Sequence, residues 1–273
     1  MNEPRSGNGG PAVELRSLTR RFGNLVAVNK VTMAVASGSI FGLLGTNGAG
    51  KTTVIKLLTT LLAPTEGTAL VVGHDIRTEP VEVRRSLGYV SQMLSSDGEL
   101  SGYENLLISA KLYRIPRAAR KPRIEQALEF MELAPVADRL VKHYSGGMIR
   151  RLEIAQAMLH RPAVLFLDEP TVGLDPVARH GVWQRIRELR EEFGTTIMMT
   201  THDMDEADQL CEMLAFMHRG NLVAQGTPIE LKARQGGKAT LDDVFIELTG
   251  SSVIEPEDYK NVAAIRRTFQ RLE

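Results

Sequence analysis

The sequence predicts an α/β fold that combines an antiparallel β-sheet, a core of buried strands and an inserted group of helices. Residues 12–37 alternate apolar and polar positions, which is typical of strands with one buried face. Short, nearly all-apolar runs indicate strands that are covered on both faces, and these are 39–44, 163–167 and 195–200. From Ser101 onward the hydrophobic period becomes helical, which indicates the insertion.

The first part of the chain is expected to be mainly β-structure. Residues 12–37 should form antiparallel strands around a turn at 23–24, with a buried face that carries Val31, Met33 and Val35. The strand 39–44 leads into a glycine-rich loop and a helix over about 51–62. This helix should end before Pro64, because proline does not continue a helix. Residues 66–90 are expected to hold further strands and turns.

The helical part opens at a capping box, in which Ser101 caps an amide and Glu104 reaches back. A second helix is expected over about 124–133, and the basic stretch 113–123 should be a solvated connection between the helices. The remaining pattern predicts, in order, the strand 163–167, a helix over 178–193, the strand 195–200, a helix over 203–212 and two short strands around the turn 218–221.

These patterns predict one domain over 12–250 with a helical subdomain inserted at about 98–160, a disordered leader over 1–11 and a charged tail over 251–273. The 33 basic residues balance 33 acidic ones, so nucleic acid is not expected as a partner. A single cysteine, Cys211, excludes an internal disulfide and is expected to serve packing. No apolar run approaches the ~18–20 residues that cross a bilayer, so the chain is expected to be soluble and cytoplasmic.

A glycine-rich loop follows the first buried strand and fits the pattern G-x-x-x-x-G-K-[ST] at every fixed position. The loop consists of Gly45, Thr46, Asn47, Gly48, Ala49, Gly50, Lys51 and Thr52. Thr53 follows it and is also expected at the nucleotide. Glycines let consecutive amides surround phosphate oxygens, and the start of a helix adds a favourable field. Lys51 would neutralise the β- and γ-phosphates, and Thr52 would offer its hydroxyl to Mg²⁺. The loop therefore predicts a nucleotide site.

Two adjacent acids follow the buried strand 163–167, where such a site needs carboxylates. Asp168 ends the strand and is expected to hold the Mg²⁺ hydration shell. Glu169 would lie beside the γ-phosphate, where a carboxylate can polarise the attacking water. Adjacent acids are usually surface charge, and the apolar run before this pair is what favours a functional role.

Five further short motifs resemble, in order and spacing, those of the ATP-binding subunits of ABC transporters. The match covers about residues 12–250 and implies a P-loop NTPase with a RecA-like core. The motifs are an adenine-stacking aromatic at Phe22, a Q-loop glutamine at Gln92, a signature resembling LSGGQ at 144–148, a D-loop at 173–175 and a switch histidine at His202. A core role for Phe22, a turn cap at Gln92 and a structural His202 are the alternatives.

The resemblance implies a site shared by two chains. Ser145, Gly146 and Gly147 of one chain would cap the γ-phosphate of the ATP that Lys51 of the other chain holds. Asp175 would couple the two sites. The implied partners are a second ATP-binding subunit and an integral-membrane permease, which would keep the chain at the cytoplasmic face of a bacterial membrane.

Within each site the resemblance implies ATP hydrolysis. Glu169, His202 and Lys51 are expected to be catalytic, and Gln92 is expected to join Thr52 and Asp168 at Mg²⁺. Departures from the common motifs occur at Thr46, Ser91, Tyr144 and Met148. None removes a catalytic group, so an active site is expected.

The sequence around the signature, YSGGMIRRLEIA, and the stretch 240–250 resemble the bacterial drug-resistance and antibiotic-export branch of this family. A GTPase would need a guanine-reading NKxD motif after the strand 195–200, where the sequence is TTIMMTTHD, and a P-loop kinase would lack the SGG turn. An importer ATPase and a non-transport ABC ATPase of DNA repair or translation remain as alternatives. An exporter of drugs or other small hydrophobic molecules is the preferred interpretation.

Overall fold

The computed structural model describes residues 10–234 and 239–250, and in this part of the chain it holds two β-sheets. The smaller sheet is antiparallel, with the order β2-β1-β4-β5. Its strands are β1 (Val13–Phe22), β2 (Leu25–Val35), β4 (Glu66–Val71) and β5 (His74–Asp75). The alternation in 12–37 is confirmed as antiparallel pairing of β1 and β2, and Val31, Met33 and Val35 are buried as expected.

The larger sheet has the order β10-β9-β3-β8-β7-β6, and its strands are parallel except at the β9–β10 edge. Its strands are β3 (Ile40–Leu44), β6 (Leu87–Val90), β7 (Val164–Asp168), β8 (Thr196–Thr201), β9 (Met213–His218) and β10 (Asn221–Gly226). Every residue of β3, β7 and β8 is buried, as expected for strands covered on both faces.

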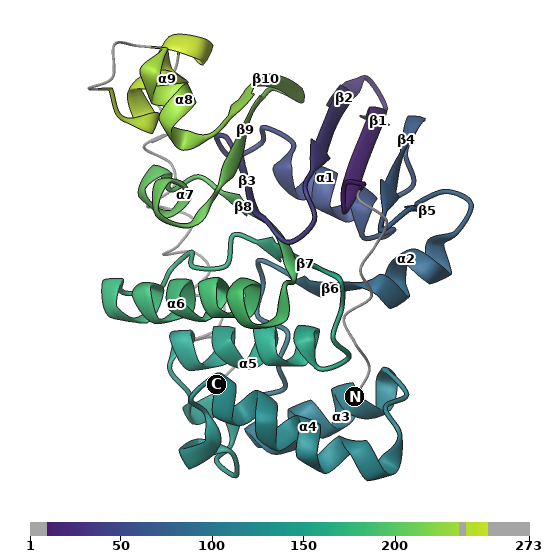
Figure 1. Ribbon diagram of the computed structural model, residues 1–273, viewed down its shortest axis with the longest axis vertical. Coiled ribbons are helices and arrows are strands. Elements are labelled where there is room, and N and C mark those ends of the chain that lie inside the picture. Colours follow the sequence, from purple (N-terminus) through teal and green to yellow (C-terminus); the bar gives the residue numbers. More distant parts are fainter. Residues whose placement is uncertain (1–9, 235–238, 251–273) are drawn as a thin grey trace.

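The hydrophobic core therefore has two halves, one on each face of the larger sheet. Along β3, Ile40 and Leu44 belong to one half, and Phe41 and Leu43 belong to the other. Helix α1 (Lys51–Leu58) packs in the half that faces the smaller sheet. On the opposite half, α5 (Gly146–Met158) packs against β6 and α6 (Pro176–Phe193). The helices α3 (Gly102–Leu112) and α4 (Arg117–Phe130) pack against α5 on the side away from the sheet (Figure 1).

The remaining described α-helices are short: α2 (Pro80–Ser86), α7 (Met204–Leu210), α8 (Pro228–Ala233) and α9 (Leu241–Thr249). Two 3-10 turns, η1 (Ala134–Val136) and η2 (Val141–His143), lie between α4 and α5. The capping box at Ser101 is confirmed, because its Oγ accepts from the Glu104 amide and the Glu104 carboxylate accepts from the Ser101 amide. Cys211 is buried, as expected for a packing role. No helix of the described ranges is both long and apolar enough to span a membrane.

Four expectations about helices were wrong. Helix α1 ends at Leu58 instead of 62, because Thr60 adopts a left-handed conformation (φ 61°). Helix α2 lies within 66–90, where only strands and turns were expected; it buries only Val83, too little for a detectable period. Helix α4 begins at Arg117, so most of the expected solvated connection is helical, and it continues through Pro122 with Ile124 and Leu128 buried. It ends at Phe130 rather than 133, because Glu132 is left-handed (φ 54°). The tail 251–273 and residues 1–9 of the leader lie outside the described residues.

Candidate functional site

The glycine-rich loop connects β3 to α1, and two of its glycines are required by the backbone. Gly45 has φ 156°, and a Cβ there would lie 2.3 Å from the carbonyl oxygen of Met217. Gly50 has φ 104°, and its Cβ would lie 2.3 Å from the carbonyl oxygen of Ala27. Any side chain at these positions would collide with backbone. The loop is therefore held against β2 and β9 in a shape that keeps Asn47 and Gly48 exposed.

Lys51 begins α1 and turns back into the loop. Its Nζ donates to the carbonyl oxygens of Gly45 at 2.7 Å and Thr46 at 3.2 Å, and it lies 3.4 Å from Oε1 of Glu169. The Lys51 side chain is only 4% exposed, so these partners, rather than water, stabilise its positive charge. Thr46, Thr53 and Gly50 are half-buried around it, and Ala49 is buried.

A hydroxyl and a carboxylate meet beside the loop at the end of β7. Thr52 Oγ1 donates to Asp168 Oδ1 at 3.0 Å, and Thr200 Oγ1 donates to the same oxygen at 2.6 Å. Burial raises the pKa of Asp168, and these two hydrogen bonds partly oppose the shift. Hard oxygen donors of this kind fit Mg²⁺, which keeps waters and nucleotide oxygens as its other ligands. In the described ranges no group of three or more His, Cys, Asp or Glu side chains could hold a metal by itself.

Glu169 is the point at which the predicted catalytic residues meet. Its carboxylate lies 3.4 Å from Lys51 Nζ, 3.4 Å from His202 Nδ1 and 3.0 Å from Gln92 Nε2. Burial by itself raises the pKa of Glu169, but the hydrogen bond from His202 and the charge of Lys51 outweigh it, and the pKa is lowered. The residue has φ 48°, a strained conformation that its amide stabilises by donating to Thr200. The carboxylate is thus held ionised beside the loop.

The signature turn forms a second cluster. Ser145 is exposed and caps α5, because its Oγ accepts from the Met148 amide at 3.3 Å. A Cβ on Gly147 would lie 2.8 Å from Cβ of Ala178, and one on Gly146 would lie 3.1 Å from Leu174 Cδ2. The signature turn therefore packs against the D-loop and the start of α6.

Asp175 of the D-loop caps α6 and accepts at 3.0 Å from the amides of Val177 and Ala178.

Phe22 ends β1 and is 43% exposed, which excludes a core role for its ring. The Arg20 guanidinium lies 4.5 Å from the ring centroid. The Gln92 side chain contacts Glu169 rather than Thr52 or Asp168.

Sequence reasoning missed an ion pair that holds the segment around Gln92. Arg150 and Glu153 of α5 are both almost fully buried and lie 3.0 Å apart. The Arg150 guanidinium donates to the carbonyl oxygens of Ser91 and Gln92, and Glu153 accepts from the Ser95 amide. The two residues stand three apart on α5, but no local pattern indicates their bonds to the segment 91–95, which lies 58 residues or more away in sequence.

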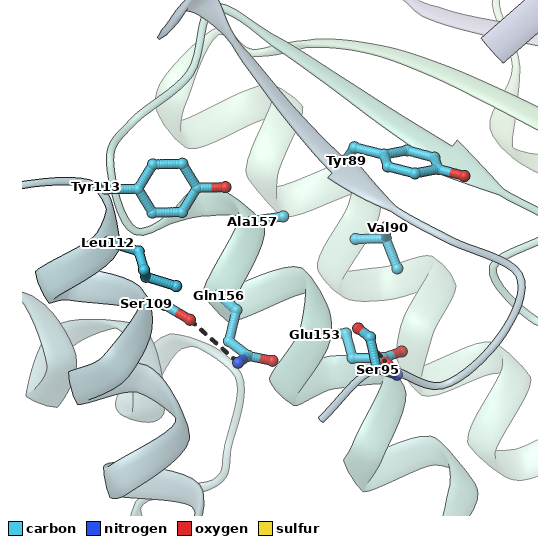
Figure 2. Close-up of a pocket in the computed structure, with 9 residues that line it drawn as sticks. All are labelled: Tyr89, Val90, Ser95, Ser109, Leu112, Tyr113, Glu153, Gln156 and Ala157. Carbon is cyan, nitrogen blue, oxygen red and sulfur yellow. Dashed lines mark hydrogen bonds between the residues drawn. The ribbon is translucent and has the colours of Figure 1, made fainter. Parts of the chain in front are cut away.

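A cavity of about 390 Å³ opens beside this ion pair (Figure 2). Figure 2 shows Tyr89 and Val90 of β6 on one side, and Leu112 and Tyr113 at the end of α3 on the other. Ala157 of α5 lies between the two sides, and Glu153 and Gln156 of the same helix lie below it. Gln156 donates to Ser109 across its floor at 3.1 Å. Leu112, which lines the cavity, is 77% exposed. Met93 (77% exposed) and Leu94 (51%) directly precede Ser95 of the lining and add further exposed apolar surface.

Comparison with known proteins agrees with this geometry. The family model described as "ABC transporter" matches residues 28–172. The daunorubicin/doxorubicin resistance ATP-binding protein DrrA of Streptomyces peucetius is 43% identical over 82% of this chain and 68% of its own length. The Nod factor export ATP-binding protein I of Rhizobium sp. is 38% identical over 96% of this chain and 83% of its own length.

A solved structure described as the ATP-binding subunit of an ABC transporter superposes with a TM-score of 0.77 and 29% identity, and the match covers 87% of this chain and 99% of the other. CbiO1 of Clostridium perfringens, part of the ABC transporter complex CbiONQ, superposes with a TM-score of 0.75 and 28% identity over 83% of this chain and 92% of its own. These likenesses match the expected fold class, in which a P-loop core carries an antiparallel sheet and a helical insertion.

Proposed function

The chain belongs to the ABC transporter ATP-binding family, and from this premise we propose that it powers an exporter of drugs or other small hydrophobic molecules. It would bind and hydrolyse ATP with Mg²⁺ and transmit the resulting motion to a separate membrane permease. The observation that carries the proposal is the convergence of Lys51, Gln92 and His202 on the Glu169 carboxylate beside the Thr52–Asp168 pair. The relatives named for drug resistance and for export favour this direction of transport and this kind of cargo.

The contacts of the site support distinct roles for its residues. On binding ATP, Lys51 would exchange its contacts with the loop carbonyls and Glu169 for contacts with phosphate oxygens, whose charge it would neutralise. Phe22 offers an exposed ring for the adenine. Thr52 and Asp168 would hold Mg²⁺, which supplies charge neutralisation at the phosphates. Glu169, with its lowered pKa, would accept the proton of the attacking water. His202 is within reach to steer that carboxylate or a phosphate oxygen.

The exposed signature turn supports a shared site. Ser145 and Gly146 are exposed at the start of the 13-residue helix α5, where free amides and the helix field favour an anion. We propose that they cap the phosphate bound by a second copy or a related chain. Their packing against the loop that carries Asp175 supports the coupling role of that residue.

The cavity of Figure 2 supports a docking place for the membrane subunit. Glu153 lines this cavity, and its ion-pair partner Arg150 bonds the Gln92 carbonyl. Because the Gln92 side chain contacts Glu169, a group bound in the cavity would act on the catalytic carboxylate. Basic residues gather in the stretch 111–123 beside Leu112, and no acidic residue interrupts it. The docked segment is therefore expected to be apolar on one side and acidic at its margin.

The Glu169→Gln variant tests the catalytic proposal. It should lower kcat for ATP by about 10²–10⁴-fold, the usual contribution of a general base, while an ATP-dependent dimer appears in size-exclusion chromatography. Lys51→Ala should instead weaken binding of a fluorescent nucleotide. The control is Glu230→Gln, at a capping box in α8 outside the site. Wild-type turnover in Glu169→Gln, or wild-type nucleotide affinity in Lys51→Ala, contradicts the assignment.

The docking proposal is tested with Leu112→Asp, which places a charge on the apolar margin of the cavity. Co-purification with the membrane subunit should be lost, while basal ATP hydrolysis of the isolated chain is retained. Ile229→Asp in α8 is the matched control, because both side chains are 77% exposed. Equal loss in both variants refutes a docking role for the cavity.

A further inference from the structure

A buried carboxylate outside the proposed catalytic set connects its parts. Glu206 lies in α7 and is only 1% exposed. Its Oε1 accepts from Thr171 Oγ1 at 2.5 Å and from Trp183 Nε1 at 2.9 Å, and the Thr201 hydroxyl is a further hydrogen-bond partner. These four residues, named here the Glu206 cluster, are all buried.

The three donors come from segments that carry proposed site residues. Thr171 follows Glu169 by two positions, and Thr201 directly precedes His202. Trp183 belongs to α6, whose N-cap is Asp175. One carboxylate therefore holds the backbone next to the proposed general base, the backbone next to the switch histidine, and the helix that follows the D-loop.

The side chains of these segments do not completely fill the space between them. A cavity of about 80 Å³ lies between them, and its lining includes Glu169, His202, Thr171 and Glu206. Glu169 also holds a strained φ of 48°, which persists only where surrounding contacts enforce it. The Glu169 amide donates to Thr200, and the bond from Thr171 to Glu206 is a further contact that holds the segment directly after Glu169.

The carboxylate is not needed to cap its own helix, because Asp203 caps α7 by accepting from the Glu206 amide at 3.0 Å. Burying a carboxylate carries a desolvation penalty of several kcal/mol, and an apolar side chain of similar size would fill the space without it. What an apolar side chain would not supply is an acceptor for three donors from three different segments.

We propose that Glu206 is a positioning residue that keeps Glu169 and His202 in working register and links both to α6. This inference rests on the proposed ATPase function. Loss of the cluster should lower the rate of the chemical step and leave ATP binding by the loop 45–52 unchanged. A residue that only stabilises the fold would lower the melting temperature without changing kcat per folded molecule.

The test compares two substitutions at Thr171, which leave α7 and its cap intact. Thr171→Val removes the hydroxyl at nearly constant volume and should lower kcat about tenfold or more, because the segment beside Glu169 loses its bond to Glu206. Thr171→Ser keeps the hydroxyl and should retain at least half of wild-type kcat. The dissociation constant of a fluorescent nucleotide should stay within about twofold in both.

Substitutions of Glu206 itself separate its charge from its hydrogen bonds. Glu206→Met removes every acceptor and should lower kcat more than Thr171→Val does, whereas Glu206→Gln keeps an acceptor oxygen and should recover part of the rate. Trp183 is the single tryptophan of the chain, so a shift of its fluorescence in Glu206→Met reports that its bond is broken in folded protein. Glu230→Gln again serves as control.

Two results would overturn the inference while leaving the ATPase proposal intact. One is wild-type kcat in folded Thr171→Val and Glu206→Met, the latter with shifted Trp183 emission. The other is a weakened nucleotide affinity with unchanged kcat. Absence of ATP hydrolysis by the wild-type chain would overturn the proposed function, and this inference with it.

Discussion

The Lys51–Glu169 ion pair gives the sharpest quantitative prediction. Its charged atoms lie 3.4 Å apart, and the two side chains are 4% and 7% exposed. At an effective dielectric constant of about 20, two unit charges at this distance attract by about 5 kcal/mol before desolvation is counted. Lys51 keeps two carbonyl acceptors when Glu169 is changed, and Glu169 keeps Gln92 and His202 when Lys51 is changed. These remaining partners should reduce the measurable coupling to about 2–3 kcal/mol.

A double-mutant cycle with Lys51→Met and Glu169→Gln measures this coupling. Urea unfolding without nucleotide, followed by Trp183 fluorescence, gives the free energy of unfolding of each variant. The double variant should be less destabilised than the sum of the two single variants. The control cycle uses Lys142 and Glu99, which lie 2.9 Å apart but are 44% and 76% exposed, and should show at most about 0.5 kcal/mol. A coupling no larger than in this surface pair refutes the reasoning.

Three further predictions concern packing and pH. Gly102→Ala places a Cβ 2.4 Å from Tyr144 Oη and should destabilise by about 1–3 kcal/mol in thermal unfolding. In the Tyr144→Phe background, which removes this atom but keeps Cζ at 3.3 Å, the cost should be smaller, and an unchanged cost would contradict the clash. Gly147→Ala meets Ala178 Cβ at 2.8 Å and should destabilise by about 1–2 kcal/mol, with recovery in the Ala178→Gly background. Burial raises the pKa of Glu206 above its usual 4.5, so its contribution to stability is complete below that pH and is lost as the pH rises through the folded-state pKa. The stability of the wild type relative to Glu206→Gln should therefore fall as the pH is raised from 4.5, and a relative stability that rises with pH would contradict this sign.

Several features could be predicted because short stretches of sequence specify them. The glycines at 45 and 50 allow backbone conformations and contacts that a side chain would block, and the capping box of Ser101 and Glu104 lies within one helical turn. The acids Asp168 and Glu169 follow a run that is apolar on both faces. In each case the residues that give the signal stand together in a short stretch of sequence, so spacing alone is informative.

Other features became visible only in the folded chain. The start of α4, which passes through a proline, depends on the burial of Ile124 and Leu128 against neighbouring helices. The bonds of Arg150 to Gln92 and of Thr171 to Glu206 join residues 58 and 35 positions apart. No pattern of spacing encodes such contacts.

The sequence by itself predicted which residues would hold a nucleotide, because backbone freedom, helix caps and strand ends are properties of short segments. The tertiary structure decided which charges meet at Glu169 and which buried carboxylate ties the surrounding segments together. The physical reason is that a hydrogen bond or ion pair depends on distances of a few ångström, and parallel strands bring distant parts of the chain to that distance only when the whole sheet has formed.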